Sequence, residues 1–252
     1  MLWIILGAAA LAGLSTSQLC TDNVRRFCGT SPATACMNDR CSIAESSEFD
    51  DSFRRQIVDA HNQYRREPFN GQDATNMLEI SWDDELARTA LNWAHQLCIA
   101  DNVFGPGHDR CRVTPSYSSV GQNMAWGAGG SWGLSSVLAN KTVDMWYSEH
   151  KLATSADLFP FGAKMAIGHY TQLIWARSHK IGCAYIVRTH PYGKQSWIIC
   201  NYAKSGNRVG QDVFERGTQG SNCPSGSTRD STGLCRVSND AQLRSALGIQ
   251  EP

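Results

Sequence analysis

The strongest strand signal in the chain is IGCAYIVRTHPYGKQSWIICNY, residues 181–202. Two runs rich in β-branched and aromatic residues, 181–188 and 195–202, flank a Pro-Tyr-Gly-Lys turn, and this pattern predicts a β-hairpin. A further strand is indicated at 120–126. The chain is therefore expected to hold a small antiparallel sheet. No regular strand–helix alternation surrounds these segments, which argues against a doubly wound or barrel fold.

Helical segments precede and separate these strands. Residues 48–66 place apolar side chains at helical spacing, and a second helix is expected from an N-cap at Ser81 to Cys98. A third helix is expected over 135–150 and a short one over 240–247. The third helix is expected to share one face among Leu138, Thr142, Met145 and Glu149. We predict an α+β fold arranged as a three-layer α/β/α sandwich.

The composition is that of a folded protein. Of 252 residues, 42% are hydrophobic and 18% are charged, and 23 Lys and Arg balance 23 Asp and Glu. This is not the signature of a disordered chain. A formal net charge of zero offers no attraction to nucleic acid or to an anionic membrane, because both recruit clustered Lys and Arg. We expect neither as a partner.

The N-terminus is predicted to be a signal peptide. The apolar run Leu2–Leu14 carries no charge, is followed by the small residues Ser15-Thr16-Ser17, and is shorter than the roughly 20 residues needed to span a bilayer. Cleavage is expected after Ser17, so the mature protein is expected to be secreted and to have no membrane span. The predicted segments are a signal peptide at 1–17, a cysteine-rich arm at 18–47, a main domain at 48–208 and a polar C-terminal extension at 209–252.

All ten cysteines lie beyond the expected cleavage site. An even number in an oxidising compartment predicts five disulfides. The chain has no Cys-x-x-Cys spacing, so a structural zinc site on sulfur is not favoured. Spacing suggests two local pairs, Cys183 with Cys200 and Cys223 with Cys235, and leaves the other six cysteines open.

Four features stand out on chemical grounds. His169 lies in the segment GHYTQLIW, which places polar groups beside large aromatic ones, and His108 lies in a turn rich in Gly and Pro. Gln122 belongs to the run Gly-Gln-Asn. Glu149 ends an apolar helical stripe, where a solvated surface carboxylate is not expected.

Two long motifs resemble the CAP superfamily of cysteine-rich secretory proteins, antigen-five venom allergens and plant pathogenesis-related proteins. They are GHYTQLIWARS at 168–178 and WIICNYAKSGN at 197–207. His61-Asn62-x-x-Arg65 and Gly121-Gln122-Asn123 fit two shorter motifs. The resemblance covers 48–208, and the cysteine-rich arm and Gly-His-Asp-x-Cys at 107–111 are most similar to the antigen-five branch of arthropod venom and saliva.

The resemblance implies a CAP domain with a central cleft lined by His108, Gln122, Glu149 and His169. Gln122 departs from the family pattern, because an amide stands in place of a carboxylate and weakens the attraction for a divalent cation. His108, His169 and Glu149 are the candidate ligands for Zn²⁺, with no obligatory cofactor expected; alternatively, these groups only hydrogen-bond to one another and to water. The resemblance also implies the disulfides Cys20–Cys36, Cys28–Cys111, Cys41–Cys98 and Cys183–Cys200.

The function implied is binding without catalysis. A secreted, disulfide-linked scaffold of the venom-allergen type is expected to sequester a small amphipathic molecule (a lipid, sterol or eicosanoid-like compound) or to act on an extracellular host protein. We expect a monomer. The cysteine-rich secretory branch carries a larger C-terminal cysteine module, of which only Cys223 and Cys235 have counterparts here, so ion-channel regulation is not favoured.

The alternative is a hydrolase. A zinc-bound water held by His108 and His169, with Glu149 as ligand or base, describes a metal-dependent peptidase. Residues 129–133 also match the G-x-S-x-G elbow of serine hydrolases, and Asp144 or Asp157 and then His169 follow in hydrolase order. The chain lacks the broad parallel sheet that such an elbow requires, so a glycine-rich loop is the better interpretation.

The remaining polar candidates are interpreted as structural. His61 is expected to be a hydrogen-bonded core histidine, with Asn62 and Arg65 tying their helix to neighbouring loops. Asn140 lies in an Asn-x-Thr sequon and is a candidate glycosylation site, although Thr142 is expected to face the apolar stripe of its helix.

Overall fold

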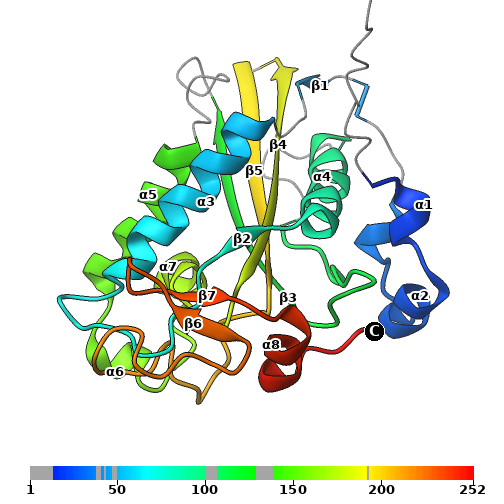
Figure 1. Ribbon diagram of the computed structural model, residues 1–252. Coiled ribbons are helices and arrows are strands. Elements are labelled where there is room, and N and C mark those ends of the chain that lie inside the picture. The colour runs from blue at the N-terminus through cyan, green and yellow to red at the C-terminus, as the bar shows by residue number, and fades with distance from the viewer. Residues whose placement is uncertain are drawn as a thin grey trace, which may run out of the picture.

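The computed structural model in Figure 1 describes residues 14–37, 41–42, 44–46, 50–99, 107–128, 139–191 and 193–252. Its central sheet has the strand order β1-β4-β5-β3, and β2 pairs in parallel with β4 outside that path. The strands are β1 (Ala44–Ser46), β2 (Ser81–Trp82), β3 (Val120–Ala128), β4 (Lys180–His190) and β5 (Gly193–Ala203).

The hairpin predicted from the strongest strand signal is confirmed. β4 and β5 pair antiparallel from Lys180 opposite Ala203 to His190 opposite Gly193, so both strands are longer than the sequence pattern indicated. β3 pairs antiparallel with the other edge of β5 along its whole length. β5 is therefore an interior strand, and every residue from Gln195 to Ala203 on it is buried.

Helices cover both faces of this sheet (Figure 1). α3 (Asp51–Arg66), α5 (Ala139–Ser148) and α7 (Gly168–Leu173) pack against one face, and α4 (Asp84–Ile99) packs against the other. Neighbouring strand residues divide between the two cores, since side chains alternate across a strand: Cys183 lies in the first core and Ala184 in the α4 core. The α+β, three-layer α/β/α architecture is confirmed.

The second predicted helix begins two residues later than expected, at Asp84. Ser81 does not cap it, because Ser81 and Trp82 form β2 beside the start of β4. The cap is Asp83, whose carboxylate accepts from the backbone N–H of Leu86 at 3.0 Å. The Ser81 prediction was wrong because a short strand paired with a distant segment leaves no local signal.

The buried face of α5 also differs from the prediction. Thr142 is buried as expected, but Met145 is 42% exposed, and Val143 and Trp146 complete the buried face instead. Glu149 lies past the end of α5, in the 3-10 helix η2 (Glu149–Leu152). The prediction assigned a single row of side chains to the buried face of this helix. The observed buried face is wider, as the i, i+3, i+4, i+7 pattern of an amphipathic helix allows.

The polar C-terminal extension packs against the main domain. Val213, Phe214 and Leu234 belong to the largest hydrophobic core. Cys235 donates its backbone N–H to Met77 at 2.8 Å and so lies alongside the main domain. The segment contains the hairpin β6 (Ser227–Arg229) and β7 (Cys235–Val237) and the predicted helix, α8 (Asp240–Leu247).

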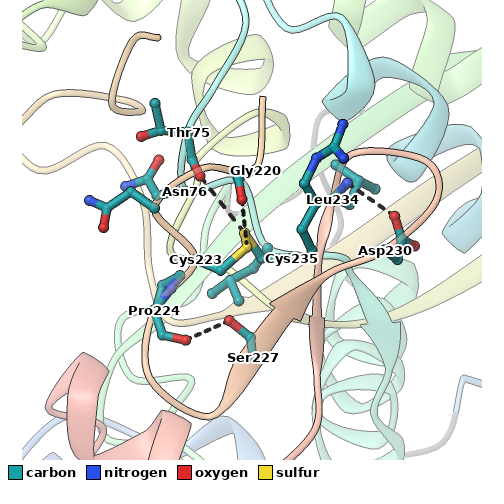
Figure 2. The surroundings of a disulfide bond; sticks show 12 residues. Thr75, Asn76, Gly220, Cys223, Pro224, Ser227, Asp230, Leu234 and Cys235 are labelled. Carbon is teal, nitrogen blue, oxygen red and sulfur yellow. Dashed lines mark hydrogen bonds between the residues drawn. A yellow bond between two sulfur atoms is a disulfide. The ribbon is translucent and has the colours of Figure 1, made fainter. Parts of the chain in front are cut away.

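All ten cysteines are paired, as five disulfides, and none is free. The N-terminal arm contains α1 (Thr16–Leu19), α2 (Asp22–Cys28) and the 3-10 helix η1 (Thr34–Cys36). Figure 2 shows the C-terminal bridge, with Thr75 and Asn76 of the main domain beside it. The observed pairs are Cys20–Cys36, Cys28–Cys111, Cys41–Cys98, Cys183–Cys200 and Cys223–Cys235, as expected.

Three of the expectations concern residues that the structure does not describe. These are residues 1–13 of the predicted signal peptide, Leu138 on the third helix and the glycine-rich run at 129–133. Within the part of the chain that is described, no helix is long and apolar enough to cross a membrane.

Candidate ligand-binding cleft

His169 and Glu149 form a hydrogen-bonded pair at the start of α7. Glu149 Oε1 lies 2.6 Å from Nδ1 of His169. Glu149 Oε2 accepts from two backbone N–H groups, those of His169 at 3.0 Å and Tyr170 at 3.1 Å. One carboxylate therefore satisfies the otherwise unpaired donors in the first turn of α7 and also orients the imidazole.

This pairing determines which ring nitrogen of His169 is free. A carboxylate in its ionised form only accepts, so Nδ1 of His169 donates and Nε2 carries the lone pair. The side chain of His169 is 36% exposed and that of Glu149 is 21% exposed. The free nitrogen belongs to a partly solvated ring.

A chain of amides orients His108 in the same sense. Asn201 donates from Nδ2 to the backbone oxygen of Leu86 at 3.2 Å, and its Oδ1 accepts from Nε2 of Gln122 at 3.0 Å. Oε1 of Gln122 then faces Nδ1 of His108 at 2.7 Å. Because that oxygen only accepts, Nδ1 of His108 donates and Nε2 is again the free acceptor. Gln122 and Asn201 are opposite one another on β3 and β5.

The charge state of His108 follows from its surroundings. Burial lowers the pKa of His108, and the positive charge of Arg112 and a protonated His169 lower it further, while the hydrogen bond to Gln122 opposes these effects. The neutral imidazole is the form that can use Nε2 as an acceptor or a ligand.

A buried layer supports the two histidines from behind. Trp146 stacks on His169 with ring centroids 6.0 Å apart and planes at 12°. Asn123 donates from Nδ2 to the backbone oxygen of His169 at 3.0 Å and to the hydroxyl of Tyr202 at 3.2 Å. The same hydroxyl lies 2.9 Å from Nε2 of His61, whose Nδ1 lies 2.7 Å from the backbone oxygen of Ile57. The interpretation of His61 as a structural core residue is confirmed.

Arg65 and Asn62 hold the loops around α7 and before β4. The Arg65 guanidinium is 1% exposed and donates six hydrogen bonds to backbone oxygens, with no carboxylate partner among them. Asn62 makes two complementary bonds with the backbone of Ile80, at 2.9 and 2.8 Å. The predicted tying role of both residues is confirmed. The acceptors of Arg65 are Leu78, Leu173, Trp175, Ala176 and Ser178.

The sequence did not point to two residues of this site, Asn201 and Tyr202. They are consecutive on β5, so their side chains go to opposite faces of the sheet: Asn201 reaches Gln122, and Tyr202 reaches His61 and Asn123. Both lie within the second long motif, and their polar groups on a strand that is otherwise apolar were the available signal.

The expected three-ligand metal set is not assembled. Within the described ranges, no group of three or more His, Cys, Asp and Glu side chains is placed to hold a metal ion. The two oxygens of Glu149 are shared among three hydrogen bonds at the start of α7. The donor set that is left for a cation consists of the Nε2 atoms of His108 and His169.

The carboxylates of the serine-hydrolase alternative are engaged elsewhere. Asp144 accepts from the hydroxyl of Tyr64 at 2.6 Å, and Asp157 of α6 (Ser155–Leu158) pairs with Lys164 at 3.0 Å. The acidic partner of His169 is Glu149. The Asn140 backbone lies in α5, and its side chain lies outside what the structure describes.

A three-layer sandwich with two oriented histidines beside its sheet defines a CAP-type domain. The family model described as the cysteine-rich secretory protein family, CAP, matches residues 58–202. The chain belongs to this family. Together with its five disulfides, its relationship to venom allergens establishes it as a secreted, extracellular protein of the venom allergen type.

Two curated relatives and one solved structure illustrate the similarity. Venom allergen 5 of Rhynchium brunneum is 32% identical over 187 residues, which cover 69% of this chain and 78% of the relative. Venom allergen 3 of Solenopsis invicta is 30% identical over 238 residues, covering 85% and 96%. The crystal structure of NaASP2 with Zn2+ covers 74% of this chain and 96% of its own, with a TM-score of 0.57 and 23% identity, so it supports the fold alone.

Proposed function

We propose that this protein is a non-enzymatic binding protein that sequesters a small amphipathic ligand at the cleft of His108, Gln122, Glu149 and His169. The observation that carries the proposal is the commitment of Glu149. A hydrolase of this type needs a base free to accept a proton from water. Glu149 instead accepts three hydrogen bonds that orient His169 and hold α7.

Exposed apolar side chains beside the polar groups support an amphipathic ligand. Leu152, at the other end of η2 from Glu149, is 56% exposed, and Met165 is 86% exposed. Met165 opens the 3-10 helix η3 (Met165–Ile167), which runs directly into α7 and His169. A ligand with a polar head and a hydrocarbon body can hydrogen-bond to the free Nε2 atoms and cover these side chains, which favours its transfer from water.

Zn²⁺ is proposed as a weak and non-obligatory ligand of the same cleft. Nε2 of each imidazole is a suitable donor, since the bond at Nδ1 fixes the ring orientation as in other histidine metal sites. Two protein ligands with solvent completing the shell bind more weakly than the three or four of dedicated zinc sites. When bound, Zn²⁺ would supply Lewis acidity, and this chain's own residues would only hold and orient it.

Native mass spectrometry of protein purified from its source tests the proposal. A co-purified mass of a lipid, sterol or eicosanoid-like compound is the expected result. Monoolein serves as an uncharged amphipathic probe in solution. Met165→Gln is expected to weaken monoolein binding about tenfold, whereas Phe27→Gln, at a 53% exposed position on the N-terminal arm, is the matched control. A bare mass together with no monoolein binding would favour an extracellular protein partner instead.

The second candidate function is metal-dependent hydrolysis. The His169–Glu149 pair favours it, because a carboxylate on Nδ1 holds the imidazole in a fixed orientation, as in catalytic metal sites. Incubation with Zn²⁺ and broad peptide and ester libraries tests it. Turnover that is lost in both Glu149→Gln and His169→Ala would replace the binding proposal with the enzyme.

A further inference from the structure

A polar cavity lies beside the C-terminal segment, built from residues other than His108, Gln122, Glu149 and His169. Its volume is about 380 Å³, within the range of small-molecule pockets. It is lined by residues 210–215 together with Ala176, Arg177 and Asn76. None of the four cleft residues lines it.

Backbone hydrogen bonds fix the segment at 210–215. Phe161 donates to the oxygen of Gln211 at 2.9 Å, and Val213 donates to the oxygen of Leu158 at 3.2 Å. Ala176 donates to the oxygen of Val213 at 2.9 Å. The cavity is therefore lined by a segment that is already held in place, so ligand binding does not carry the entropy cost of ordering it.

Asn76 contributes an unpaired donor to this cavity. The residue is 6% exposed, and its Oδ1 accepts from the backbone N–H of Glu215 at 3.0 Å. Within the described ranges its Nδ2 has no hydrogen-bond partner. Nδ2 is not one of the fully buried side-chain atoms that lack a partner, so water or a ligand can reach it. The free N–H groups are suited to an acceptor oxygen brought by a ligand.

Charged side chains of both signs line the same cavity. Arg177 is exposed, lines the cavity and makes no hydrogen bond or ion pair with any described residue. Asp212 and Glu215 supply the negative charges of the lining. Asp212 has no partner among the described side chains, whereas Oε2 of Glu215 accepts from Asn222 at 2.7 Å.

We propose that this cavity binds a small zwitterion that carries one carboxylate and one ammonium group, such as a free amino acid or a dipeptide. The ligand carboxylate would accept from Arg177 and from Nδ2 of Asn76, and its ammonium would donate to Asp212 and Glu215. Arg binds carboxylates through parallel N–H donors, and an ammonium offers three donors to carboxylates. A ligand with both charges pairs with the donors and with the carboxylates, whereas a simple anion or cation leaves one of these two sets unpaired.

Titration calorimetry with L-alanine and L-alanyl-L-alanine tests the proposal. Propionate and ethylamine serve as probes that carry only one of the two charges. The expected result is binding of at least one zwitterion, with affinities for propionate and ethylamine lower by about tenfold or more. Equal binding of propionate, or no zwitterion binding tighter than about 10 mM, would overturn it.

Three variants locate the site. Arg177→Ala and Asp212→Asn are each expected to weaken zwitterion binding about tenfold. Asn76→Asp is also expected to weaken it, because this variant keeps the acceptor for Glu215 but replaces the free donor with a carboxylate that repels the ligand carboxylate. Arg55→Ala, at an exposed residue of α3, is the matched control and should leave binding unchanged. Arg177 is exposed, so its variant is expected to fold, which unfolding curves verify. Binding that survives both Arg177→Ala and Asp212→Asn would reject this cavity as the site.

Discussion

Acid is expected to lower the free energy of unfolding through two buried histidines. Replacing one of them should remove the part of this decrease that it causes. His179 is 0% exposed, and neither ring nitrogen has a hydrogen-bond partner in the described ranges. Asp240 Oδ1 is 3.9 Å from Nε2 of His179, beyond hydrogen-bond distance. Burial lowers the pKa of His179 to about 3, helped by the positive charges of Lys180, Arg244 and Arg65.

The sign follows from proton linkage. The folded pKa of about 3 lies below the 6.5 of an unfolded histidine, so below pH 6.5 the unfolded chain binds a proton that the native state does not. The contribution of this histidine to the free energy of unfolding is fully present above pH 6.5 and is lost as the pH falls toward 3. Between pH 7 and pH 5 the loss from one such histidine is about 2 kcal/mol. His61, whose pKa burial also lowers to about 3, contributes a similar loss.

Urea unfolding at pH 7 and pH 5, followed by tryptophan fluorescence with the disulfides intact, measures this loss. His179→Leu and His179→Gln should each reduce the difference in unfolding free energy between the two pH values by about 2 kcal/mol relative to the parent. Carboxylates contribute equally to parent and variants, so they cancel in this comparison. The two variants will differ in stability at pH 7, because only Gln buries a polar group. If both lose as much stability in acid as the parent, the reasoning is refuted.

The remaining predictions concern the core arginine, the C-terminal bridge and the cleft. Arg65→Met should destabilise the fold by about 3–5 kcal/mol in chemical denaturation, because it removes six hydrogen bonds to backbone oxygens, of which, among the described residues, only those of Trp175 and Ala176 accept from another donor. The exposed neighbour variant Arg66→Met should change the stability by less than about 0.5 kcal/mol. Replacing Cys223 and Cys235 together by Ser should cost about 3 kcal/mol, as thermal unfolding would show, since the bridge closes a separation of 12 residues; a change near zero would contradict the packing described. In zinc calorimetry at pH 7.5, Gln122→Glu should strengthen binding about tenfold by adding a carboxylate behind His108, and the double variant His108→Ala/His169→Ala should abolish it. Unchanged zinc binding in that double variant would place any metal site elsewhere.

Local pattern was sufficient for the hairpin and for α8. In β4 and β5 the β-branched and aromatic runs and the turn between them are contiguous, so strand and partner are both visible within residues 181–202. The motif segments likewise identified His108, Gln122, Glu149 and His169 as residues of interest. Their hydrogen bonds were not visible, because Glu149 and His169 come from different elements and Gln122 depends on Asn201 across a strand pair.

Contacts between distant parts of the chain decided the features that local sequence patterns predicted wrongly. Ser81 became part of a strand because β4 lay beside it, and the polar composition after residue 209 hid the few apolar side chains that the main core takes in. Glu149 illustrates the same limit in the site. Its residue type fits a metal ligand, but the backbone donors of α7 compete for its oxygens and are present only in the folded chain.

The sequence by itself determined the class of fold and the secreted and disulfide-linked character, and it pointed to the candidate site residues. These follow from short-range periodicity, composition and motif, which the unfolded chain already contains. The tertiary structure alone decided what those residues can do, since it commits Glu149 to a helix start and leaves Nε2 free on both cleft histidines. It also brought Asn76 into one cavity with Arg177, Asp212 and Glu215. Hydrogen bonds and burial depend on neighbours from distant parts of the chain, and only folding brings them together.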